Sequence, residues 1–173
     1  MSRMAATLIL MAMMAAAPAY AQQSEMENLQ AGGDALLANH RETTQYSIDR
    51  ATQALQARDY KTARRFASSV VRADPKRIES WKLLGAAQIG LQDWSGARRS
   101  YTGAIRITPG DPESRGGLGV AMARLNDPKA QEQLIWLTAR VAACTSSCAA
   151  LEGYKREVDA AMAAAAGPSQ SHR

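Results

Sequence analysis

The chain repeats itself at a fixed interval, and this periodicity limits the fold more than any other feature. The stretch RDYKTARRFASSVVRADP at 58–75 returns as QDWSGARRSYTGAIRITP at 92–109. Aspartate recurs at the same interval, at Asp59, Asp93 and Asp127. A period of about 34 residues is typical of proteins that stack helix–turn–helix units, so we expect a helical solenoid. The predicted units span 44–77, 78–111 and 112–141.

Both copies of the repeated stretch have the pattern of an amphipathic helix. Alanines and larger apolar residues recur every three or four positions, which places them on one stripe of a helix. The stripe residues are Ala63, Phe66, Ala67, Val70 and Val71 in the first copy and Ala97, Tyr101, Ala104 and Ile105 in the second. Aromatic residues make up only 5% of the chain, which favours closely packed helices over a sheet.

Residues that start and stop helices flank the stripes. Asp59 and Asp93 precede them and are suited to accept hydrogen bonds from free backbone N–H groups at a helix start. Pro75 and Pro109 follow them and end the helix, because the residue before a proline avoids the helical region. Each unit is therefore predicted to be a pair of helices whose apolar face only the next pair can cover.

The middle unit begins with Trp81, Leu84 and Gly85, which form a W-x2-L-G motif. With this motif the unit resembles the tetratricopeptide repeat (TPR) family, although Gln88 replaces the family's first-helix tyrosine, and the other two units resemble the family less closely. Second-helix positions of the family are matched by Ala97, Tyr101, Ala104 and Pro109. The first unit lacks the opening motif, and in the third Pro128 replaces the aromatic residue. The resemblance implies an all-α, right-handed superhelix of about three helix pairs, in a small exported bacterial TPR protein.

The segments outside the repeats are predicted to be a capping helix, a linker and a tail. Residues 142–166 hold a cysteine-containing turn and a helix that we expect to cap the stack. Its apolar stripe consists of Leu151, Tyr154, Val158 and Met162. Residues 22–43 are polar and contain Gly32-Gly33, so we expect a linker, with a short helix as the alternative. Residues 167–173 are expected to be a flexible tail.

The first 21 residues have the layout of a secretory signal peptide. Arg3 supplies the positive charge, an apolar run follows, and Ala19-Tyr20-Ala21 is a small-x-small cleavage pattern. The alternative, a retained membrane anchor, is disfavoured because the run is short and rich in alanine. No cysteine follows Ala21, which argues against a lipoprotein. We expect cleavage after Ala21, no transmembrane segment in the mature chain, and a bacterial periplasmic location.

Cys144 and Cys148 are the only cysteines of the chain. In an exported protein an even number of cysteines points to a disulfide, here one that pins the turn before the capping helix. Reduced thiols are the alternative. Because the spacing is not Cys-x-x-Cys and further ligands are lacking nearby, neither redox chemistry nor a metal site is expected.

Glycines in the repeats are expected to mark close contacts between helices. Gly85 and Gly119 each cost about 1 kcal/mol of helix propensity relative to alanine, which a neighbouring helix at short distance would offset. The RGGLG stretch at 115–119 is also interpreted in this way. A phosphate-binding loop is disfavoured there, since the flanking strand and Lys-Ser/Thr are missing.

Arginines recur in register with the repeat. Arg65 and Arg72 lie two helical turns apart, off the apolar stripe, as do Arg99 and Arg106. Stacking would align them in a basic ridge on the convex face, which suits an acidic protein or an anionic envelope polymer. An ordinary solvated face is the alternative. Nucleic acid is not expected for an exported chain without an aromatic stacking platform.

The resemblance also implies a concave groove, lined by first helices, that binds a peptide. Its candidate residues are Gln45, Asp49, Thr52, Glu79, Lys82, Val120 and Arg124. A groove without a particular ligand is the alternative. No catalytic residue, cofactor or metal ligand is nominated, because no nucleophile, histidine and acid come together in the pattern.

The expected function is therefore an exported protein-interaction module, a scaffold or adaptor in cell-envelope, pilus or secretion assembly. The alternative is a structural accessory that binds an anionic envelope polymer through the arginine ridge. The partner, another protein or a peptide, and the oligomeric state are not determined by the sequence.

Overall fold

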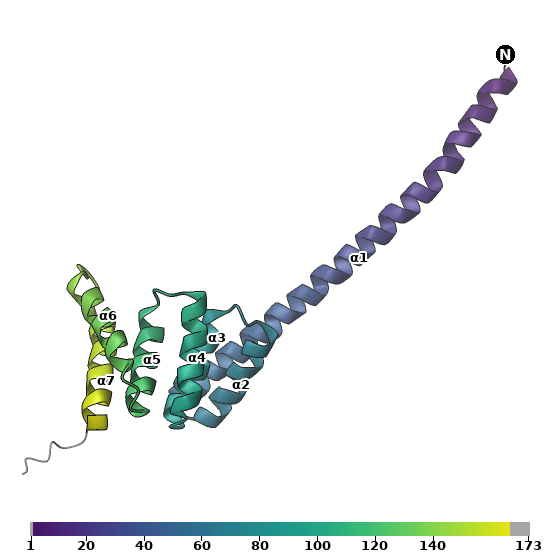
Figure 1. Ribbon diagram of the computed structural model, residues 1–173. Coiled ribbons are helices and arrows are strands. Elements are labelled where there is room, and N and C mark those ends of the chain that lie inside the picture. Colours follow the sequence, from purple (N-terminus) through teal and green to yellow (C-terminus); the bar gives the residue numbers. More distant parts are fainter. Residues whose placement is uncertain (1, 167–173) are drawn as a thin grey trace, which may run out of the picture. The chain divides into compact units, whose positions relative to one another are not determined.

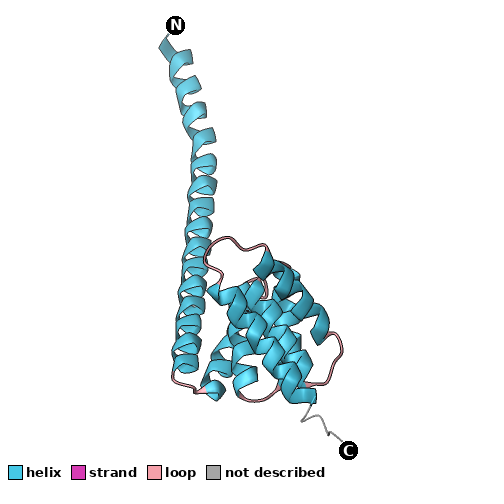
Figure 2. Ribbon diagram, turned by 90° about the vertical axis from the view of Figure 1, so that its left-hand side faces the viewer, coloured by secondary structure: helices cyan, strands magenta, loops and turns pink. Residues whose placement is uncertain are grey.

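The computed structural model describes residues 2–166 and contains only helices and loops in that range (Figures 1 and 2). Side chains are described from residue 25 onward. The predicted tail at 167–173 lies outside the described residues. The seven described helices are α1 (Ser2–Gln56), α2 (Tyr60–Ala73), α3 (Ile78–Gly90), α4 (Trp94–Ile107), α5 (Pro112–Arg124), α6 (Ala130–Ala142) and α7 (Ala149–Ala166). The prediction of an all-α fold is confirmed for these residues.

The chain divides into two compact units, Met1–Thr43 and Thr44–Arg173. Helix α1 contributes residues to both units. In the first unit, residues 22–43 are helical, whereas the sequence predicts a linker. Side chains of 25–43 are exposed, and a Cβ added at Gly32 or Gly33 would meet no atom within 4 Å. The helix persists because the alanine, leucine, glutamine and glutamate residues around the two glycines are strong helix formers.

In the second unit, the turn between the two helices of each pair is the same and recurs once in every repeat. Arg58, Gln92 and Asn126 have positive φ values of 59°, 59° and 55°. The next residue in each turn is the recurring aspartate, whose N–H donates to the carbonyl oxygen five positions earlier, at 2.8, 2.8 and 2.9 Å. This is the bond that closes a helix through a left-handed residue. The sequence periodicity is therefore also a periodicity of the backbone.

Aspartate side chains start three of the helices. Asp59 accepts from the N–H of Thr62 at 3.1 Å, and Asp93 accepts from that of Gly96 at 2.9 Å, as the sequence predicts. Asp111 does the same at the start of α5. The third pair differs, because Pro128 follows its aspartate and α6 begins only at Ala130.

The core is a row of alanines and rings between successive helices. The α2 stripe packs through Ala63 and Ala67 against residues 51–55 of α1 and against α3. Tyr101 of α4 is 4% exposed and fills the space between α3 and α5. The predicted close contact at Gly85 is confirmed, because a Cβ there would lie 2.7 Å from the Tyr101 ring.

Helix α7 packs on α5 and α6, with Val158 and Ala161 buried. The glycines of the RGGLG stretch face this helix and α4, which supports the packing interpretation of that stretch. A Cβ would lie 2.8 Å from Tyr154 at Gly116, and 2.7 Å from Val158 at Gly119. Gly117 faces the Tyr101 ring at still closer range.

A disulfide bond joins Cys144 and Cys148 in the turn before α7, with the two Cα atoms 5.9 Å apart. Such bonds form and persist in oxidising compartments, which is the environment the structure indicates for this chain. Within the described part of the chain, no helix is both long and apolar enough to cross a membrane.

Candidate functional site

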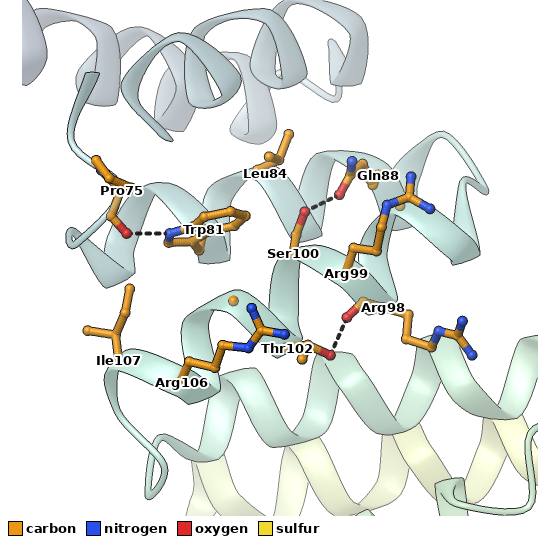
Figure 3. Close-up of a pocket in the computed structure, with 12 residues that line it drawn as sticks. Pro75, Trp81, Leu84, Gln88, Arg98, Arg99, Ser100, Thr102, Arg106 and Ile107 are labelled. Carbon is orange, nitrogen blue, oxygen red and sulfur yellow. Dashed lines mark hydrogen bonds between the residues drawn. The ribbon is translucent and has the colours of Figure 1, made fainter. Parts of the chain in front are cut away.

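A cavity of about 670 Å³ opens between α3 and α4 (Figure 3). Trp81, Leu84 and Gln88 line it from α3, at positions that share one face of that helix. Pro75, before α3, lies at one end. Helix α4 contributes Gly96, Arg98, Arg99, Ser100, Thr102, Gly103, Arg106 and Ile107.

Helix α4 presents small residues to α3, which allows side chains of α3 to lie close to its backbone. Gly103 lies beside the Trp81 ring, and a Cβ there would be 2.8 Å from it. The Trp81 indole N–H donates to the carbonyl oxygen of Pro75 at 2.8 Å, which holds the ring in place. An aromatic surface is thus fixed in orientation and left accessible between the two helices.

Gln88, at the position where the TPR pattern has tyrosine, joins α3 to α4 by hydrogen bonds. The Ser100 hydroxyl donates to its side-chain oxygen at 2.6 Å. With the amide turned over, the nitrogen of Gln88 instead donates to Ser100 and to the carbonyl oxygens of Gly96 and Leu84, which satisfies more groups. In both orientations, the amide side chain of Gln88 occupies the position of the larger tyrosine ring in the TPR pattern.

Two of the four predicted ridge arginines lie at the cavity. Arg99 and Arg106 are exposed and line it, two turns apart on α4, which is about 10 Å along the helix axis. Neither has an ion-pair partner among the described residues. Their neighbour Arg98 is engaged, since it donates to Asp127 at 3.3 Å.

The other two ridge arginines lie on α2 and do not line this cavity. The Arg65 guanidinium lies 4.8 Å from the centre of the Phe66 ring, in a cation–π arrangement. Arg72 is exposed in the last turn of α2, where a positive charge suits the helix dipole. The structure therefore separates the predicted ridge into two different environments.

The predicted groove residues also lie in several environments. Gln45 donates to Asp49 at 3.0 Å and accepts from Arg77 at 3.4 Å. Thr52 is half-buried and Glu79 is exposed.

Lys82 is occupied by an ion-pair network that links α3 to α5. Its ammonium lies 2.5 Å from Glu113 and 3.6 Å from Asp111. Burial by itself lowers the pKa of Lys82, but the hydrogen bond and charge of Glu113, with help from Asp111, outweigh it and raise the pKa. Lys82 thus holds two helix pairs together, and its charge is largely compensated within the chain.

The last two groove candidates lie near the C-terminal helices. Val120 is partly buried and packs against the alanine cluster that α5, α6 and α7 share. The exposed Arg124 places its guanidinium 5.6 Å from the centre of the Trp94 ring.

The sequence nominates Arg99 and Arg106 as ridge residues but does not indicate the cavity that they line. A signal was present: Gly96, Ser100 and Gly103 are spaced four and three apart, so α4 carries a stripe of small residues on one face. The packing of α3 against α4 decides which residues face this stripe, and the sequence pattern does not determine that packing.

No known family model matches the chain, and no curated protein matches it. Among the described residues, no three histidine, cysteine or acidic side chains are grouped so as to hold a metal ion.

Proposed function

We propose that residues 44–166 form a TPR-type right-handed superhelix that works as a protein-interaction module. Its role would be that of a scaffold or adaptor in cell-envelope, pilus or secretion assembly. The observation that carries the proposal is the identical left-handed turn at Arg58, Gln92 and Asn126, one in each repeat. Solenoids built from such units present long surfaces, and binding is the common use of those surfaces.

A second structural recurrence supports the repeat. Trp81 donates to the carbonyl oxygen of Pro75, and at the equivalent position of the next unit Arg115 donates to that of Pro109 at 3.3 Å. A different side chain thus makes the same bond in the next unit. Retention of the bond despite the change of residue type supports a common architecture for the units.

The proposal includes export. Residues 1–21 would be a signal peptide cleaved after Ala21, and the mature chain would work in a periplasm, without a lipid anchor. The disulfide between Cys144 and Cys148 supports this, because such bonds are rare in a reducing cytosol.

A second candidate function is binding of an anionic envelope polymer along the basic ridge. The exposure of Arg72, Arg99 and Arg106 favours it. A polymer would be held mainly by charge, so its binding would weaken steeply with salt and would need arginines on both α2 and α4.

Photo-crosslinking in the producing cell tests the primary proposal. A benzophenone amino acid would replace Glu79 on the predicted groove side, Arg72 on the ridge, or Thr145 in the disulfide turn as a control. We expect discrete adducts with a protein from at least one of the first two positions and none from the third. If no position gives an adduct with a protein, the interaction role is refuted. Adducts between the residue 72 position and a polysaccharide would support the second candidate.

A further inference from the structure

We propose that the cavity between α3 and α4 binds an extended acidic segment of a partner protein, with one apolar side chain inserted against Trp81. This inference deepens the proposed interaction function and rests on it for its biological meaning. It also moves the binding surface from the groove implied by the repeat pattern to the face that carries Arg99 and Arg106.

The floor of the cavity suits an apolar side chain. Trp81, Leu84 and Ile107 provide aromatic and aliphatic surface, and Gly103 allows the indole to lie directly against α4, because a Cβ there would be 2.8 Å from the ring. Ile107 is 38% exposed, so part of this surface faces solvent. The volume of about 670 Å³ lies in the range of pockets that take drug-sized ligands, about 300–1,000 Å³, and is ample for one leucine or phenylalanine with its backbone.

The rim of the cavity suits two carboxylates. Arg99 and Arg106 border it with no acidic partner among the described residues, and their positions on α4 differ by about 10 Å. In a polyproline II segment, residues three apart lie on the same side and about 9 Å from each other. Two acidic residues at positions i and i+3 would therefore reach both guanidinium groups, with the apolar side chain between them directed at Trp81.

The combination of charge and apolar floor distinguishes the occupant. An anionic polymer needs the arginines but has no use for the surface around Trp81 and Ile107. An uncharged apolar peptide would leave both guanidinium groups unpaired. Electrostatic complementarity of this kind fixes register and suppresses wrong partners. The second set of ridge arginines, Arg65 and Arg72, lies outside the cavity and should not contribute.

The test uses a fluorescein-labelled peptide with the core sequence Glu-Pro-Leu-Glu, flanked by glycine and serine, and the full mature chain. Binding would be followed by fluorescence anisotropy at low salt. Arg99→Gln and Arg106→Gln should each weaken binding about three- to fivefold, as expected for an exposed charge pair. The matched controls, Arg65→Gln and Arg72→Gln, each remove the equivalent charge one unit earlier and should each leave affinity within twofold.

A second set of variants tests the apolar contact in the same binding assay. Changing leucine to serine in the peptide should weaken binding about tenfold or more, because the peptide loses the apolar surface that would be buried against Trp81. Ile107→Ser, at a part-exposed position, should weaken binding of the leucine peptide but not of the serine peptide. Circular dichroism of each variant checks that the helices remain formed.

Several results would overturn the inference. No binding at about 1 mM peptide would do so, as would equal losses in the α2 and α4 arginine variants. Indifference to the leucine would indicate attraction by charge alone. If crosslinking yields a protein partner while the peptide result is negative, the interaction role stands and this site falls. If no partner is found but the peptide binds as expected, the site stands and the cellular role falls.

Discussion

Gly117→Ala tests the packing that holds the helix pairs together. Gly117 of α5 faces the ring of Tyr101, and the same ring lies on Gly85 of α3 from the other side. A methyl group at Gly117 would overlap the ring. The ring cannot move away toward α3, because it already lies so close to Gly85 that a Cβ there would be only 2.7 Å from it. Tyr101 is almost fully buried, so the strain falls on the interface between helix pairs.

Two opposing effects set the magnitude. Overpacking a buried site typically costs about 1–3 kcal/mol, and the rigid ring places this site in the upper part of that range. Alanine in place of glycine in a helix interior gains about 1 kcal/mol. We expect a net loss of about 1–2 kcal/mol in the free energy of unfolding, and a midpoint temperature lower by roughly 3–8 °C.

Gly153→Ala is the matched control. Gly153 lies inside α7, and a Cβ there would meet no atom within 4 Å. The same substitution at this position should keep the propensity gain without the overlap, and so raise the free energy of unfolding by up to about 1 kcal/mol. Thermal and urea unfolding of both variants, followed by circular dichroism at the helix band, measures the difference.

A double-mutant cycle ties the loss to the ring. Tyr101→Leu removes the ring at its own cost, and in that background Gly117→Ala should be nearly neutral or stabilising. If Gly117→Ala alone stabilises the chain as much as Gly153→Ala does, the close contact between α4 and α5 does not limit packing, and the reasoning is refuted.

Three further changes have expected outcomes. Asp93→Ala should cost about 1 kcal/mol in urea unfolding, because the start of α4 loses its cap; an unchanged midpoint would contradict the cap. Reduction of the bond between Cys144 and Cys148 should cost roughly 2 kcal/mol, given its short loop, and a thermal midpoint indifferent to reductant would contradict this. Burial, and next the charge of Glu113, raise the pKa of Tyr154, so its contribution to stability is present below about pH 10 and is lost as pH rises through the folded pKa. Glu113→Gln should shift its ultraviolet titration to lower pH, and an unmoved titration would contradict the role of that charge.

The sequence by itself determined where α2 and α4 begin and which residues cap them. Asp59 and Asp93 precede helices as predicted, and the repeat spacing places the left-handed turns, because caps, turns and apolar stripes are local effects of neighbouring residues. The glycine contacts were also predictable in kind, since a helical glycine needs a close neighbour to offset its propensity.

Only the tertiary structure decided which side chains share a surface. Lys82 carries the charge expected of a groove residue, but packing of α5 beside α3 brings Glu113 to it and neutralises it. Arg65 and Arg99 are equivalent in the repeat, yet the first lies on a phenylalanine ring and the second beside an open cavity. Such differences arise because residues distant in sequence meet only when the helices stack, and no local pattern records which neighbours they will find.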